Sequence, residues 1–158
     1  MIKYDYKAII LFLPKVCQWI ENQENFIASN GRNLSEEEIE IAKIIGIKNY
    51  DVIKVYESPI VPNPDDIVLL EIGKDIGLLS THTNGICFRY GIFINENTAD
   101  KKGVLVHELI HTLQYEQYGT IPHFINQYVK ECIELGYQNS PLELEAITKT
   151  NLFLNPKV

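Results

Sequence analysis

The chain is organised around the stretch His107-Glu108-Leu109-Ile110-His111, which has the spacing H-E-x-x-H. Residues four apart on an α-helix lie above one another on the same face, so both imidazole rings can reach one metal ion. Glu108 projects to the side of that face, where its carboxylate can accept a proton from a water molecule on the metal. The pattern therefore predicts a helix that carries two metal ligands and a general base.

The residues around the motif predict that this helix is largely buried. We expect it to run from Thr98 or Asp100 to Tyr118, with Gly119 just beyond its end. Unpaired imidazole and carboxylate groups inside such a helix would cost free energy, whereas a metal ion and its water would satisfy them. The alternative is two core histidines with ordinary hydrogen-bond partners and a surface glutamate. The apolar residues that cover most of the helix are Val104, Leu105, Val106, Leu109, Ile110 and Leu113.

Length and patterning predict one domain over residues 1–158, of the α+β class and mostly helical, with a small sheet before the motif helix. We expect a helical N-terminal part in residues 1–50. A small sheet and one helix follow in residues 51–97. Residues 98–158 hold the motif helix and a later helix that carries a candidate for a third metal ligand.

Capping residues and glycines mark the other helices, and alternating or β-branched segments mark the strands. Asp51–Glu57 is expected to form a strand. Gly85–Asn95, directly before the motif helix, is expected to form one long strand or a tight hairpin. The expected helices are residues 14–29, a capping box at Ser35 through Ile45, Asn63-Pro64-Asp65-Asp66 through about Lys74, Pro122–Leu135 and Ser140–Leu154.

Composition narrows the partners of the protein. The net charge is −7 and lysine and arginine form no cluster, which argues against nucleic acid and anionic membrane surfaces. No apolar run is long enough for stable membrane insertion and no secretory signal is evident, so we expect a cytoplasmic protein. Three widely spaced cysteines, Cys17, Cys87 and Cys132, are expected to be reduced thiols. The sequence leaves the oligomeric state open.

A catalytic zinc site needs a third protein ligand and an open position for water. In the longer motif H-E-x-x-H-x-x-G-x-x-H, the glycine and the third histidine would stand at positions 114 and 117. Both positions are glutamine in this chain, so a site with three histidine ligands of that class is excluded. The remaining candidates are Glu143 and Glu145 on the last helix. Ser140 and Glu143 have the spacing of a capping box, which would engage Glu143 with the backbone. We therefore predict Glu145 as the third ligand, with Glu143 as the alternative.

Together these residues resemble the gluzincin class of metallopeptidases, whose third ligand is a glutamate on the next helix of the site. More closely, Val106–Glu116 and Gly136–Ala146 are similar to a group of small bacterial proteins assigned as zinc metallopeptidases with no established substrate. The resemblance implies a minimal zincin-like domain with Zn²⁺ held by His107, His111 and Glu145. It also implies that the strand Phe88–Ile94 forms the upper edge of a cleft and pairs with an extended peptide.

The expected reaction is hydrolysis of a peptide bond in a peptide or protein substrate, with Glu108 as general base. Related enzymes stabilise the oxyanion with a tyrosine or histidine, and the candidates are Tyr137, His123, Tyr90 and Tyr115. Tyr137 is favoured because it lies shortly before the third ligand. The other remaining histidine, His82, is expected on a surface loop.

Two alternatives to a general peptidase remain open. The chain could be a non-catalytic zinc-binding or regulatory interaction protein with a vestigial peptidase site. It could also be a regulatory protease that acts on a single partner protein. The sequence predicts the chemistry of the site and does not distinguish among these roles.

Overall fold

The computed structural model describes residues 5–80 and 83–156. Helices account for 65% of the chain and accompany a small four-stranded sheet, which confirms the predicted, mostly helical α+β fold. The elements in chain order are α1 (Tyr6–Ile9), η1 (Ile10–Phe12), α2 (Leu13–Asn30), β1 (Arg32–Asn33), α3 (Glu36–Ile45), η2 (Tyr50–Val52), β2 (Lys54–Ser58), α4 (Ile67–Asp75), β3 (Gly85–Phe88), β4 (Gly91–Asn95), α5 (Lys101–Tyr118), α6 (Ile121–Leu135), η3 (Tyr137–Asn139) and α7 (Pro141–Leu154).

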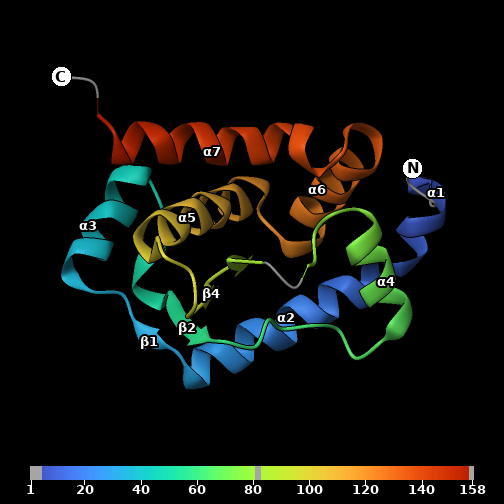
Figure 1. Ribbon diagram of the computed structural model, residues 1–158, viewed down its shortest axis with the longest axis horizontal. Coiled ribbons are helices and arrows are strands. Elements are labelled where there is room, and N and C mark those ends of the chain that lie inside the picture. The colour runs from blue at the N-terminus through green and yellow to red at the C-terminus, as the bar shows by residue number, and fades with distance from the viewer. Residues whose placement is uncertain (1–4, 81–82, 157–158) are drawn as a thin grey trace.

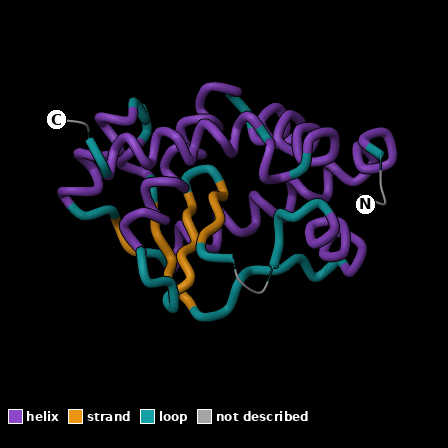
Figure 2. The backbone as a smooth tube through the Cα atoms, turned by 45° about the horizontal axis from the view of Figure 1, so that its top comes forward, coloured by secondary structure: helices purple, strands orange, loops and turns teal. Residues whose placement is uncertain are grey.

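The elements are stacked in layers, which Figure 1 shows from top to bottom as α7, α5, the sheet and α2. Helix α6 closes one end of the stack beside α2 and α5, and α3 packs against α5 at the other end. The strands lie side by side among the surrounding helices in Figure 2. The motif helix α5 is thus enclosed between the sheet and α7, which explains why its middle is buried.

The sheet has the order β1-β2-β4-β3, in which β2 and β4 are parallel and the other pairs are antiparallel. Residues 91–94 of β4 are all buried, because α2 covers one face of this central strand and α5 covers the other. The predicted cleft strand, Phe88–Ile94, therefore lies mostly within a strand that already has partners on both sides. Within the described residues, the edge strand on this side is β3.

Hydrogen bonds at the helix ends explain where the helices begin and stop. Both halves of the predicted capping box form in α3, and Gly46 ends that helix with a φ of +104°. Asp100 accepts a hydrogen bond from the N–H of Gly103 at the start of α5, and Gly119 follows the end of α5 with a φ of +89°. These expected boundaries are confirmed to within a residue or two.

Other boundaries differ from the expectation for local reasons. Helix α4 begins later than predicted because Asp66, and not Asn63, accepts the capping hydrogen bonds from Val68 and Leu69. The strand predicted from Asp51 begins only at Lys54, after the short helical turn η2. The short elements α1, η1 and β1 were not predicted.

The segment Gly85–Asn95 forms the hairpin of β3 and β4, one of the two predicted arrangements. Its turn contains Arg89 with a φ of +61°, a left-handed conformation that costs free energy for a residue with a side chain. Two hydrogen bonds from the Arg89 guanidinium to Glu24, at 2.6 and 2.8 Å, hold the turn on α2. The hydroxyl of Thr112 donates to the Arg89 carbonyl oxygen at 2.6 Å, which fixes the turn to α5.

The apolar core lies on both sides of the sheet. One cluster joins α2, α6 and the face of the sheet that bears Phe88 and Phe93, and the other joins α3 and α5 to the face that bears Ile92 and Ile94. Cys17, Cys87 and Cys132 are free thiols. In the described part of the chain, no helix combines the length and apolar character needed to span a membrane.

Candidate metal site

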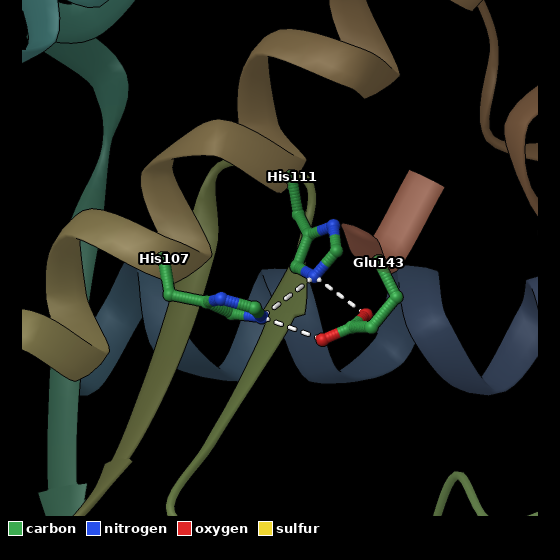
Figure 3. A group of neighbouring side chains, drawn as sticks. All are labelled: His107, His111 and Glu143. Atoms are coloured by element: carbon green, nitrogen blue, oxygen red, sulfur yellow. Dashed lines mark hydrogen bonds and ion pairs between the residues drawn. The ribbon is translucent and has the colours of Figure 1, made fainter. Parts of the chain in front are cut away.

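Three side chains that could hold a metal ion come together between α5 and α7: His107, His111 and Glu143 (Figure 3). The Nε2 atom of His107 lies 2.8 Å from Oε1 of Glu143, and Nε2 of His111 lies 3.2 Å from Oε2. The two Nε2 atoms are 3.2 Å apart. The helical spacing thus brings both imidazole rings to one point, as predicted, and α7 supplies a carboxylate opposite them.

The separations of these atoms fit a metal ion with tetrahedral coordination. Bonds of about 2.0–2.1 Å in a tetrahedral site put neighbouring ligand atoms about 3.3 Å apart. The observed separations of 2.8–3.2 Å lie close to this spacing, with His107 measured to Oε1 of Glu143 and His111 to Oε2. Two imidazole nitrogens and one carboxylate oxygen suit zinc and related divalent metals, and three protein ligands leave one position open.

Gln114 orients the His111 ring. The Oε1 atom of Gln114 lies 2.8 Å from Nδ1 of His111, and its Nε2 donates to the carbonyl oxygen of Leu142 at 2.9 Å. In the neutral imidazole this pairing favours the N–H on Nδ1, which leaves the lone pair of Nε2 for a metal ion. Gln114 is fully buried, and its hydrogen bond to Leu142 connects the motif helix to the start of α7.

The third member of the group that could hold a metal ion is Glu143, and not the predicted Glu145. The Ser140 hydroxyl accepts a hydrogen bond from the N–H of Glu143, as in a capping box, but the Glu143 carboxylate does not return to the backbone. Glu131 of α6 takes over that end of the helix, because its Oε1 accepts hydrogen bonds from the Ser140 hydroxyl and the Leu142 N–H. The Glu143 carboxylate is therefore available to the histidines.

Glu145 lies two residues further along α7 and has different partners. Its Oε1 accepts a hydrogen bond from Nε2 of Gln114 at 2.9 Å and lies 3.7 Å from Nζ of Lys149. Its side chain is 41% exposed. Glu145 thus supports the glutamine that orients His111 and lies outside the group of candidate ligands.

Two tyrosine hydroxyls complete the surroundings of Glu143. Tyr137 donates to Oε1 at 3.0 Å, and Tyr128 donates to Oε2 at 2.7 Å. Burial and the nearby Glu143 charge raise the pKa of both phenols, so both remain protonated donors. Tyr137 was a predicted site residue. Tyr128 was missed because it lies within α6, where no sequence motif marks it.

Glu108, the predicted general base, lies beside this group and is only 6% exposed. Within the described residues, its carboxylate makes no hydrogen bond. Burial raises the pKa of Glu108, and the nearby charges of His111 and His107 oppose that rise only in part. A buried carboxylate with raised pKa and unused acceptor atoms is suited to accept a proton during a reaction.

The histidines and Glu143 strongly affect one another. Burial favours the protonated form of Glu143, but hydrogen bonds from His107 and His111 outweigh it and hold the pKa of that carboxyl far below its ordinary value. For His111, burial lowers the pKa, whereas the hydrogen bond to Glu143 and the charge of Glu108 raise it further, to about 9. A metal ion must therefore displace a proton from His111 when it binds.

The other candidates for an oxyanion donor lie in different environments. His123 is exposed at the start of α6. Tyr90 donates its hydroxyl hydrogen to Glu116 at 2.9 Å. Tyr115 is buried in the core, where the centre of its ring lies 4.0 Å from the centre of the Phe124 ring. His82 lies outside the described residues.

No known protein family, curated protein or solved structure matches this chain in the comparisons made.

Proposed function

We propose that the protein is a zinc-dependent peptidase whose metal ligands are His107, His111 and Glu143. The observation that carries the proposal is Glu108, a buried carboxylate with no hydrogen-bond partner in the described part of the chain, next to three candidate ligands. Burying a carboxylate costs free energy, and a purely structural metal site would have no use for one that is neither a ligand nor hydrogen-bonded. An enzyme that activates water needs a base at this place.

Each residue of the site has a role in the proposed hydrolysis. Zinc, when bound, lowers the pKa of water and polarises the carbonyl group of the scissile bond. Glu108 accepts the proton of the attacking water and returns it to the leaving amine nitrogen. The hydroxyls of Tyr137 and Tyr128 orient Glu143. When Glu143 holds the metal, Tyr137 can turn its one hydroxyl hydrogen from Glu143 to the developing oxyanion.

The edge of the sheet provides a place for an extended substrate. Strand β3 pairs only with β4 among the described strands, and its first residues, Gly85 and Ile86, line the same cavity as Glu108. A peptide can bind such an edge by adding one strand. The proposal thus assigns to β3 the role that sequence resemblance assigned to Phe88–Ile94.

Metal content and one variant test the proposal. The purified protein should contain about one zinc ion per chain by elemental analysis. Glu108→Gln should retain this zinc and lose hydrolysis by about 10²–10⁴-fold, because it removes the base and spares the ligands. The activity should be measured with a mixed peptide library, and the products identified by mass spectrometry.

Glu40→Gln is the matched control, since Glu40 is exposed on α3 and pairs, among the described residues, only with Lys43. This variant should retain both zinc and activity. A Glu108→Gln protein that hydrolyses peptides at the wild-type rate would disprove the role of Glu108. Zinc binding without hydrolysis by the wild type would instead favour the non-catalytic alternative.

A further inference from the structure

A cavity of about 150 Å³ leads from the candidate metal site into the apolar core. Its polar end is formed by His107, Glu108, His111, Tyr128 and Tyr137. From there it extends between α2, α4, β3 and α6. Packed interiors rarely contain voids much larger than a water molecule, so a space of this size beside reactive groups calls for an occupant.

The walls away from the polar end are aliphatic and aromatic. Helices α2, α4 and α6 each contribute to them. A charged side chain would find no partner of opposite charge among the described residues at this apolar end, and burying it there would cost several kcal/mol. The side chains that define this part of the cavity include Trp19, Ile20, Ile72, Ile76, Ile125 and Val129.

The volume of the cavity indicates the size of its occupant. An apolar protein cavity of about 150 Å³ is large enough to bind benzene. The space of about 150 Å³ in this protein therefore suits an aromatic ring or a branched aliphatic side chain, and a methyl group would leave most of it empty. Because Glu108 and the first residues of the edge strand β3 line the cavity, a side chain of a peptide that pairs with this edge and passes the metal site can enter it.

We propose that this cavity is the specificity pocket of the peptidase and binds a bulky apolar side chain, aromatic or branched aliphatic, of a residue next to the scissile bond. This inference rests on the proposed function, because it names the substrate class for the same site. The pocket selects by the gain from burying apolar surface and by the cost of burying charge.

Helix α4 provides a wall that can be changed without touching the proposed metal ligands. Ile72 is buried and faces the cavity, whereas Ile67 on the same helix is 67% exposed. Ile72→Phe should fill part of the pocket, and Ile67→Phe adds the same ring on the solvent side as a matched control. Val129→Phe fills the pocket from α6 and provides a second variant, should Ile72→Phe fail to fold.

The only tryptophan of the chain, Trp19, lines the cavity and allows binding to be measured without catalysis. The probes are short peptides that are identical except for one residue, which is phenylalanine, leucine, alanine, lysine or aspartate. Binding to Glu108→Gln protein is followed by Trp19 fluorescence, and kcat/KM of the wild type is measured with the cleavage position mapped by mass spectrometry. Folding of each variant is checked by circular dichroism.

We expect the phenylalanine and leucine peptides to bind and react at least about tenfold better than the alanine peptide, with lysine and aspartate weakest. Ile72→Phe or Val129→Phe should remove this preference by about tenfold and leave the alanine peptide unaffected, and Ile67→Phe should behave as wild type. Hydrolysis without a preference for bulky apolar residues would overturn the pocket and leave the peptidase proposal intact. Selective binding without any hydrolysis would support the pocket and count against the peptidase proposal.

Discussion

The carboxylate of Glu143 is in contact with four polar side chains at once. Two imidazole rings and two tyrosine hydroxyls surround it, each at hydrogen-bonding distance. Because the residue is only 2% exposed, water cannot replace any of these partners cheaply. Glu143 therefore fixes the relative positions of α5, α6 and α7 whether or not a metal is bound.

Substitution of the two glutamates of α7 should distinguish their roles. Glu143→Ala should weaken zinc affinity by more than about 100-fold, because it removes a direct ligand. Loss of a residue that only hydrogen-bonds a ligand typically costs about 10–100-fold. Glu145→Ala should lower affinity within that smaller range, since Glu145 acts only through Gln114. Zinc affinity can be measured by competition with a chelator. Equal losses in the two variants would contradict the assignment of Glu143.

Five consecutive residues were enough to predict that His107 and His111 meet, because helical geometry alone brings their rings together. The role of Glu108 as a base stays a prediction. The structure groups Glu143, and not the predicted Glu145, with the two histidines. The capping-box pattern misled the prediction, because the backbone N–H of Ser140 donates to the Tyr137 carbonyl oxygen and leaves the Glu143 carboxylate free to face the histidines. Glu131, from α6, accepts hydrogen bonds from the Ser140 hydroxyl and the Leu142 N–H. Contacts of this kind between different helices cannot be recognised from one sequence.

Strand β3 lies directly against the proposed base. A Cβ atom added at Gly85 would come within 2.7 Å of Cγ1 of Val104 and 3.0 Å of Oε1 of Glu108. The absence of a side chain at Gly85 thus allows the edge strand to approach the Glu108 carboxylate closely. The position of the base depends on packing between β3 and α5 as well as on its own helix.

Gly85→Ala should lower kcat by about tenfold or more while zinc content stays at the wild-type level, because the new methyl group displaces the Glu108 carboxylate. Gly91→Ala is a matched control on the neighbouring strand, where a Cβ atom would approach Glu24 and Ile27 of α2 instead. Both variants should lose about 1–3 kcal/mol of stability from overpacking. Only Gly85→Ala should lose activity per folded molecule. The folded fraction of each variant is taken from a denaturation curve, and the measured activity is divided by it.

The boundaries of α3 were predicted well because caps and left-handed glycines are local signals, as at Ser35 and Gly46. The order of the strands was not predicted. Strand β1 has only two residues and owes its conformation to pairing with β2, and the parallel contact of β2 with β4 joins segments separated by α4 and β3. These contacts depend on the whole fold, and no local pattern encodes them.

At the scale of the whole molecule, Glu116 joins three parts of the chain. Its carboxylate accepts hydrogen bonds from the backbone N–H groups of Lys48 and Asn49, which follow α3, and from the Tyr90 hydroxyl in the hairpin turn. Burial raises the pKa of Glu116, but the hydrogen bonds from Lys48 and Asn49 prevail and hold it below the ordinary value of 4.5. The charged form therefore stabilises the folded state.

Glu116→Gln should lower the free energy of unfolding at neutral pH by about 1–2 kcal/mol, a value reduced for partial solvent exposure. Because the folded-state pKa is depressed, this difference is fully present above pH 4.5 and disappears as the pH falls through the lower folded-state pKa. Urea denaturation between about pH 7 and about pH 3 can measure it. The exposed Glu40→Gln serves as control, and a difference that persists in acid would contradict the proposed role of the charge.

The position of Glu143 in the first turn of α7 also bears on how long a metal ion would stay. Helix ends open at a lower free energy than buried helix interiors. Glu143 follows the short turn η3 and lies only three residues beyond the cap Ser140, whereas His107 and His111 lie in the protected middle of α5. Opening of this turn would have to break the contacts of Glu143 and those of Glu131 with Ser140 and Leu142, and it would then release one ligand and leave two. The residence time of the metal would follow this local opening, visible as amide hydrogen exchange at residues 142–144, and not the global unfolding of the protein.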